Sequence, residues 1–140
     1  MTELLRNFAG RLRAVVANRR ASPRRPARLA CLVSFHEPRA SDQSRRPPTL
    51  EARTRDLSAT GVALVTPSIR INDRYLTDST LVLRLELPAG RVEMIVQSVR
   101  YERLAPEGGD GDEGYLVGVR IVEAGEEDRA RYEEHLRGLA

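Results

Sequence analysis

Two short groups of residues in this sequence carry side chains suited to one ligand. Arg20 and Arg24 have the spacing R-x-x-x-R, and Asp56, Ser58 and Gly61 have the spacing D-x-S-x-x-G. A guanidinium fork matches both phosphate oxygens and the O6/N7 edge of guanine. A carboxylate can accept hydrogen bonds from the N1–H and the 2-amino group of guanine. The two groups are therefore chemically complementary to a guanine dinucleotide.

The composition bounds the class of protein. A chain of 140 residues with 41% apolar and 31% charged residues is typical of one soluble globular domain. The single cysteine, Cys31, cannot form an internal disulfide, which suits a reducing compartment, so we expect a cytoplasmic protein. No stretch reaches the roughly 18 apolar residues of a membrane span, and residues 1–18 lack the features of a signal peptide.

The charge is unevenly distributed along the chain. All 23 basic residues are arginines, and residues 1–55 hold 13 of them against four acids, whereas residues 56–140 hold 10 against 16 acids. The acidic part would repel a long phosphate backbone, so this pattern favours a compact anion. Aromatic residues make up 4% of the chain, too few for a platform that stacks single-stranded nucleic acid. We therefore expect no nucleic acid polymer as a partner.

The ends of the chain are predicted to flank a β core. Residues 1–18 show apolar side chains at helical spacing and are predicted to form an amphipathic helix, which could also join two copies of the chain. Residues 19–28 are rich in Arg and Pro and are predicted to be an extended or looped arm. Residues 29–140 form the predicted core domain, whose last segment, 126–137, reads as a helix with acids in its first turn.

Six segments of the core domain have the patterns of β-strands. They cover residues 29–35, 49–55, 61–65, 81–87, 92–101 and 115–122, with a bulge expected near Gln97 and Ser98 and a loop near residues 71–78. The turn at 58–61 then connects two strands of a hairpin. Short antiparallel strands favour a barrel or a sandwich, because closure removes exposed edges. The predicted fold class is all-β with flanking helices.

Other kinds of site find little support in the sequence. His36 and His135 lie far apart without neighbouring ligands at metal-binding spacing, and the loop at 108–112 lacks the EF-hand pattern. The sequence contains no nucleophile elbow, no Walker loop and no cysteine with a plausible histidine partner. We therefore predict no metal, no cofactor and no enzymatic activity.

The two motifs, in this order and at this distance, resemble those of the PilZ domain family of bacterial cyclic di-GMP (c-di-GMP) receptors. Gly118 also looks like the glycine that the family usually shows in its last strand. The resemblance implies a six-stranded antiparallel β-barrel followed by a helix. It also implies that Arg20, Arg24, Asp56 and Ser58 contact c-di-GMP, and that Gly61 permits a positive φ or a close approach to the ligand.

The arginine motif has two possible registers. Arg24 and Arg28 also have the spacing R-x-x-x-R, although the family resemblance favours Arg20 and Arg24, because a few residues normally separate the second Arg from the first strand. In this family an Arg directly before the motif is associated with an intercalated dimer of the ligand. Arg19 has that position, so the resemblance implies two c-di-GMP molecules per chain.

The resemblance leaves two hypotheses about function. In the first, the chain is a c-di-GMP receptor whose arm closes over the ligand and alters contacts with an unidentified downstream protein. In the second, it is a PilZ-like adaptor that acts mainly through partner contacts, with weak or no nucleotide binding.

Overall fold

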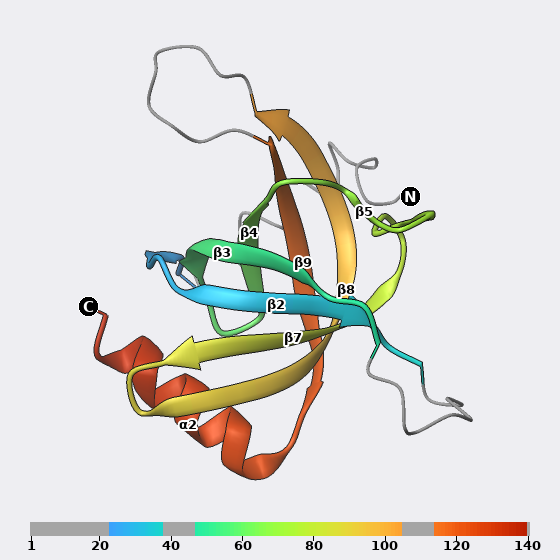
Figure 1. The fold of residues 1–140 in the computed structure, drawn as a ribbon. Coiled ribbons are helices and arrows are strands. Elements are labelled where there is room, and N and C mark those ends of the chain that lie inside the picture. Colours follow the sequence, from blue (N-terminus) through green and yellow to red (C-terminus); the bar gives the residue numbers. More distant parts are fainter. Residues whose placement is uncertain (1–22, 38–46, 105–113, 140) are drawn as a thin grey trace, which may run out of the picture.

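The computed structural model describes residues 23–37, 47–104 and 114–139. Six strands form a closed antiparallel barrel, followed by one helix (Figure 1). The strands are β2 (Ala30–Phe35), β3 (Leu50–Leu57), β4 (Gly61–Thr66), β7 (Thr80–Leu87), β8 (Gly90–Leu104) and β9 (Gly114–Ala124), and the helix is α2 (Glu126–Arg137). The predicted strands, the barrel and the C-terminal helix are confirmed. The helix predicted over residues 1–18 lies outside the described residues.

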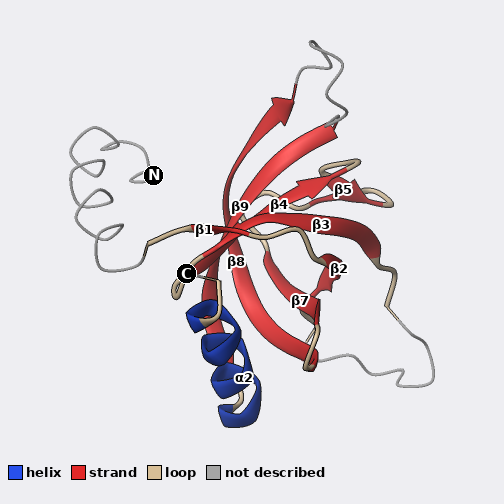
Figure 2. Cartoon of the chain, turned by 90° about the vertical axis from the view of Figure 1, so that its left-hand side faces the viewer, coloured by secondary structure: helices blue, strands red, loops and turns tan. Residues whose placement is uncertain are grey.

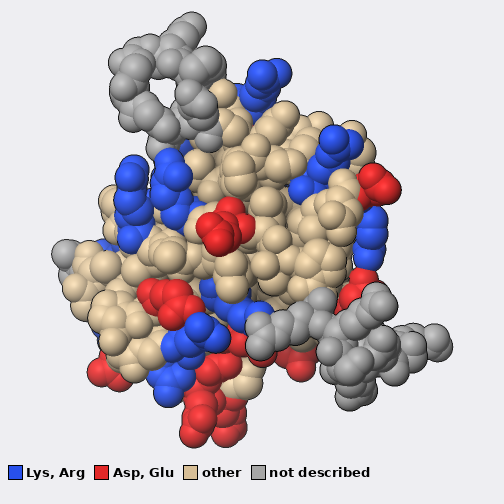
Figure 3. Space-filling model, viewed as in Figure 1, with Lys and Arg blue, Asp and Glu red and all other residues tan. Residues whose placement is uncertain are grey.

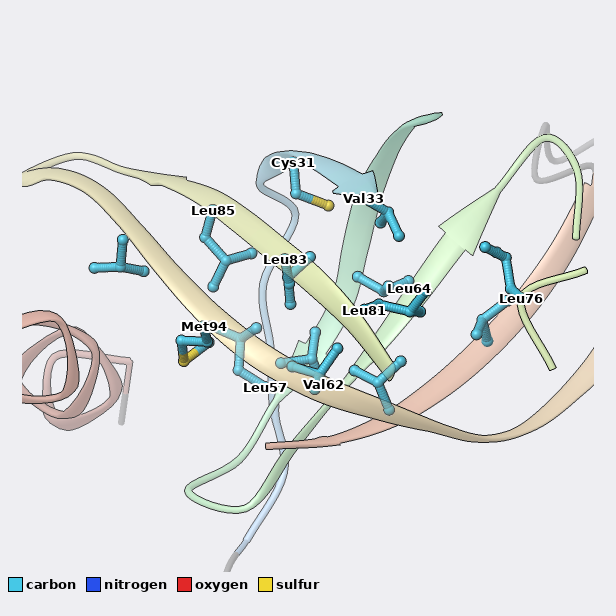
Figure 4. Packing of buried hydrophobic residues seen from close by; sticks show 14 of the residues in the cluster. Cys31, Val33, Leu57, Val62, Leu64, Leu76, Leu81, Leu83, Leu85 and Met94 are labelled. Atoms are coloured by element: carbon cyan, nitrogen blue, oxygen red, sulfur yellow. The ribbon is translucent and has the colours of Figure 1, made fainter. Parts of the chain in front are cut away.

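Alternating side chains of the six strands fill the barrel. On β7, Leu81, Leu83 and Leu85 are fully buried, and the residues between them face outward. Figure 4 shows these leucines meeting Val62 and Leu64 of β4 across the interior. Each fully buried side chain of this size contributes about 1.5–3 kcal/mol of hydrophobic stabilisation. The period-2 pattern of the sequence therefore determines which face of each strand forms the core.

Strand β3 closes the barrel because both of its edges are paired. One edge pairs with β4, and the other pairs first with β2 and then with β1 (Arg25–Pro26). Pro26 lies opposite Asp56, so the arm, which was predicted to be extended or looped, continues the sheet beside the second motif (Figure 2). The order around the barrel is β3-β2-β7-β8-β9-β4, which returns to β3.

A β-bulge at Arg55 reverses the alternation of β3. The register with β4 shifts between Thr54 and Asp56, so that Thr54 and Leu57 both face the interior. Without the extra residue, strict alternation would turn Asp56 inward and Leu57 outward. The bulge therefore lets Leu57 face the core although Thr54, three positions earlier, does so too, and it leaves the carboxylate of Asp56 on the outer face. The alternation predicted for residues 49–55 does not continue through this point.

The buried hydroxyl of Thr54 fastens the arm to β3. It donates a hydrogen bond to the carbonyl oxygen of Ala27 at 2.6 Å and accepts one from the N–H of Leu29 at 2.9 Å. Two backbone hydrogen bonds, from Thr54 N–H to Leu29 and from Ala27 N–H to Arg55, accompany it. These bonds satisfy backbone groups where the chain crosses from β1 to β2 and leaves the regular ladder.

The segment after β4 is more ordered than the loop predicted near residues 71–78. It contains a small hairpin of β5 (Arg70–Ile71) and β6 (Arg74–Tyr75). Arg74 forms an ion pair with Glu37 at 2.6 Å and lies over the ring of Phe35, with its guanidinium carbon 3.9 Å from the ring centroid. Ile71 and Leu76 are buried, which explains why the segment is held against the barrel.

Strands β8 and β9 form a hairpin that extends beyond the rest of the barrel (Figure 1). The pairing of β7 with β8 ends at Thr80 and Gln97, whereas the pairing of β8 with β9 continues to Leu104 and Gly114. The register shifts between Ser98 and Arg100, which confirms the predicted bulge near Gln97 and Ser98.

Helix α2 lies against the end of the barrel where β8 begins (Figures 1 and 2). Tyr132 is its one fully buried side chain, and Leu136 packs against the same core. Asp128 accepts a hydrogen bond from the backbone N–H of Glu93 at 3.2 Å. The three acids at residues 126–128 in its first turn match the helix dipole. Across the described ranges, no helix has the length and apolar character needed to cross a membrane.

Replacing Thr54 should measurably weaken the fold. Thr54→Ala leaves the carbonyl of Ala27 and the N–H of Leu29 without their partner, which should lower the free energy of unfolding by about 1–3 kcal/mol in urea denaturation. Thr54→Ser is the matched control, because it keeps the hydroxyl and loses about one methyl group, worth about 0.8 kcal/mol. Equal losses in the two variants would contradict the role given to the hydroxyl.

Candidate ligand-binding site

The structure brings one residue from each motif into direct contact. Nη1 of Arg24 donates a hydrogen bond to Oδ1 of Asp56 at 2.7 Å, although 32 positions separate them in sequence. The contact depends on the pairing of Pro26 with Asp56 and on the bulge that turns the carboxylate outward. Arg20 and Arg19 lie outside the described residues, so Arg24 is the arginine of the favoured motif whose position the structure gives.

The Arg24–Asp56 ion pair is accessible to a ligand. The side chain of Arg24 is 44% exposed and that of Asp56 is 23% exposed. Exposed ion pairs contribute at most about 1 kcal/mol, whereas a hydrogen bond to a charged group contributes about 1.5–3 kcal/mol. The second carboxylate oxygen of Asp56 accepts no hydrogen bond from the described residues. A ligand can therefore bind to Asp56 without first breaking a strong internal contact.

Ser58 builds the turn that follows Asp56. Its hydroxyl accepts hydrogen bonds from the N–H of Gly61 at 3.1 Å and of Thr60 at 3.3 Å, and donates one to the carbonyl of Gly61 at 3.3 Å. These contacts use the one donor and two acceptor positions of a hydroxyl. Ser58 is also 5% exposed. In this structure its role is to shape the turn, and the expected contact with a ligand stays a prediction.

Gly61 lies close to a neighbouring strand, and its expected approach to a ligand stays a prediction. Its φ is not positive, so the expectation of a left-handed conformation is wrong. A Cβ at this position would lie 2.7 Å from the carbonyl oxygen of Val119 on β9. The close approach is therefore between two strands of the barrel, and any larger residue would push β4 away from β9.

Helix α2 holds the same turn through the phenol of Tyr132. Its hydroxyl donates to the carbonyl oxygen of Ser58 at 2.7 Å and lies 3.5 Å from that of Gly61. Burial raises the pKa of Tyr132 above its ordinary value of 10.0; the charge of Asp56 also raises it, and the bond to Ser58 opposes the shift. The phenol thus stays protonated and acts as a donor. The turn is held from inside the barrel while Asp56 faces outward.

Basic side chains surround the arm on the outer face of the barrel. A shallow hollow of about 430 Å³ lies beside it, lined by Arg28, Arg53 and Arg55 and by Pro26, Ala27, Thr54 and Val65. Arg28 belongs to the alternative register of the arginine motif, so both arginines of that register, Arg24 and Arg28, lie next to β3. In Figure 3 acidic side chains gather at the lower end of the molecule, over helix α2. The charge asymmetry of the sequence thus becomes a group of arginines beside the arm and a group of acids in the first turn of α2.

Metal binding gains no support from the described geometry. Over residues 23–37, 47–104 and 114–139, no three side chains of His, Cys, Asp or Glu converge as metal ligands. Cys31 is buried in the core, and burial raises the pKa of its thiol to about 12, so it stays protonated and unreactive.

Comparison with protein families identifies the fold family. A family model described as the PilZ domain matches residues 18–138, most of the chain. The chain belongs to the PilZ family. A search of curated proteins gave no match.

Solved structures share the fold of this PilZ chain at low sequence identity. One is the PilZ domain with c-di-GMP of YcgR from Escherichia coli, with a TM-score of 0.62, 14% identity and coverage of 86% of this chain and 91% of that one. The Bacillus subtilis inhibitor of motility MotI/DgrA has a TM-score of 0.57 and 17% identity, with coverage of 86% of this chain and 50% of that one. The K. pneumonia MrkH–c-di-GMP complex has a TM-score of 0.58 and 19% identity, with coverage of 84% of this chain and 50% of that one. The chain thus spans about half the length of the last two.

Two residues that support this PilZ site were not predicted from the sequence. Nothing in the sequence near Thr54 shows that its hydroxyl would bond to residues 27 and 29. The carbonyl that Tyr132 bonds to lies 74 positions earlier in the chain. A buried tyrosine needs a partner for its hydroxyl, and that requirement was the available signal.

Tyr132→Phe should loosen the turn that carries the PilZ motif. The loss of the bond to Ser58 should lower the free energy of unfolding at pH 7 by about 1 kcal/mol in urea. Because the pKa of Tyr132 is raised in the folded state, its contribution is complete below pH 10 and declines as the pH rises further. The difference between the intact chain and the variant should therefore shrink above pH 10.

The exposed Tyr75 supplies the control for this measurement, since Tyr75→Phe removes a hydroxyl at a side chain that is 53% exposed. A loss as large as that of Tyr132→Phe would show that the effect does not come from the contact with Ser58.

Proposed function

We propose that this PilZ protein is a cytoplasmic receptor for c-di-GMP and not an enzyme. The observation that supports the proposal is the contact of Arg24 with Asp56, because it brings the two motifs to one place on the outer face of the barrel. The family match and the solved structures of YcgR and MrkH with c-di-GMP point in the same direction.

Each residue has a distinct task in the proposed complex. Asp56 accepts from the N1–H and 2-amino group of a guanine through the oxygen that Arg24 leaves open. Arg24 and Arg20 bind phosphate oxygens or the O6/N7 edge of guanine through two parallel donors. Ser58 and Gly61 keep the carboxylate in position through the turn and its close contact with β9.

Binding is proposed to close the arm over the barrel. The arm is anchored at Ala27 and Leu29 by Thr54, whereas Arg24 is held by an exposed ion pair of at most about 1 kcal/mol. A ligand that bridges Arg24 and Asp56 would replace this weak contact with several charged hydrogen bonds. The closed arm would then present a changed surface to a downstream protein, so that signalling follows from altered protein contacts.

Titration with c-di-GMP tests the proposal directly. Isothermal titration calorimetry on the intact chain should give micromolar or tighter binding. Arg24→Ala and Asp56→Ala should each weaken it by about tenfold or more, since each removes charged hydrogen bonds worth about 1.5–3 kcal/mol. We also propose that Arg19 supports an intercalated dimer of c-di-GMP, so the titration should saturate at two ligands per chain.

Two controls separate this outcome from weaker explanations. Glu37→Ala removes a carboxylate whose ion pair lies with Arg74, away from the motifs, and should leave binding unchanged. An excess of a generic oligonucleotide should not compete, since nucleic acid binding would be driven by charge alone. The absence of c-di-GMP binding by the intact chain would refute the proposal and leave the adaptor hypothesis.

The register of the arginine motif can be decided with two further variants. We propose Arg20 and Arg24 as the pair, so Arg20→Ala should abolish binding in the same titration while Arg28→Ala preserves it. The physical reason is that each arginine of the true pair contributes a guanidinium fork to the ligand. The reverse result would transfer the assignment to Arg24 and Arg28.

A further inference from the structure

One row of paired residues crosses the outer face of the barrel from the candidate site. Asp56 on β3 pairs with Ala63 on β4, Ala63 pairs with Gly118 on β9, and Gly118 pairs with Arg100 on β8. Residues directly opposite each other on neighbouring strands point to the same face of a sheet. With strands about 4.8 Å apart, the row places Arg100 about 14 Å from Asp56 along the sheet.

Bulges orient the charged residues at both ends of this row. The bulge at Arg55 turns Asp56 outward. On β8, the register shift between Ser98 and Arg100 turns Arg100 outward. Ser98 faces the interior and is 3% exposed, so strict alternation would also have turned Arg100 inward. Bulges that redirect a single side chain are frequent beside functional sites.

The middle of the row is low and lacks free backbone donors. Ala63 and Gly118 have the smallest side chains available, so neither of them stands up from the sheet between the two charged ends. Strands β4 and β9 are each paired on both edges, so their backbone N–H groups are used within the sheet. The backbone in the middle of the row therefore offers no donors to a phosphate.

The side chain of Arg100 lies over Gly118. A Cβ on Gly118 would stand 3.3 Å from its Cγ, 3.4 Å from its Nε and 3.9 Å from its Cδ. The side chain therefore follows the sheet surface over Gly118. It is exposed and has no ion pair or hydrogen bond with the described residues. This explains the glycine on the last strand, because a larger residue would lift the arginine off the sheet.

We propose that Arg100 is a further ligand-binding residue, which holds a guanine base against its guanidinium plane at the end of the row opposite Asp56. The inference rests on the proposed function and adds a contact that neither sequence motif contains. An exposed guanidinium has a planar face that a base can stack on, and arginine stacks on such rings where lysine does not.

The test is a c-di-GMP titration of three variants of the full chain. Arg100→Ala should weaken binding at least about fivefold, the lower limit for the loss of one stacked base. Arg100→Lys should be equally weak, because it keeps the charge but lacks the plane. Gly118→Val should weaken binding in the same direction, because it displaces Arg100. The melting temperatures of the two Arg100 variants should stay close to that of the intact chain.

Arg103→Ala is the matched control. Arg103 is exposed on the same strand but pairs with Tyr115, so it points to the opposite face of the hairpin, and its loss should leave affinity unchanged. Affinity of Arg100→Ala within twofold of the intact chain, while Arg24→Ala loses binding, would overturn this inference and leave the proposed function standing. Full binding by Arg100→Lys would also overturn it. No binding by the intact chain would overturn both proposals.

Discussion

The closure of the barrel through β3 is the constraint on which the rest of the structure depends. This one strand must pair with β4 along one edge and with both β2 and β1 along the other. A regular strand could not turn both Thr54 and Leu57, three positions apart, toward the core and leave Asp56 outward. The extra residue at Arg55 resolves the conflict, and the arm then lies next to Asp56 because β1 occupies the remaining edge.

The site is stabilised from inside the molecule and exposed outside it. The turn after Asp56 is fixed by the hydroxyl of Ser58, by the close approach of Gly61 to Val119, and by the phenol of Tyr132. None of these groups needs to move for a ligand to reach the carboxylate. The arm, by contrast, is held near Arg24 by an exposed ion pair. Asp56 is thus a rigid acceptor, and Arg24 is a loosely held donor. In this arrangement, binding of a ligand can move the arm while Asp56 keeps its position.

Much of this organisation could be predicted from the sequence. The features that could not be predicted depend on pairing between residues that are distant in the sequence. Alternating apolar residues determined the six strands, and charge and apolar spacing determined the last helix. The strand predicted at 49–55 continues to Leu57, because the sequence pattern alone does not distinguish the end of a strand from a bulge. The partners of Tyr132, and the row from Asp56 to Arg100, exist only once the barrel has closed.

The unequal lengths of the strands leave one part of this closed barrel open. Beyond Gln97, the edge of β8 that faced β7 has no partner strand within the described ranges, and the segment continues to Leu104. Open edges of this kind tend to recruit strands from other molecules. Here Arg100, Glu102 and Arg103 follow one another along the edge, and a second copy would have to bury these charges to extend the sheet. These charges therefore disfavour pairing of this edge with a second copy of the chain.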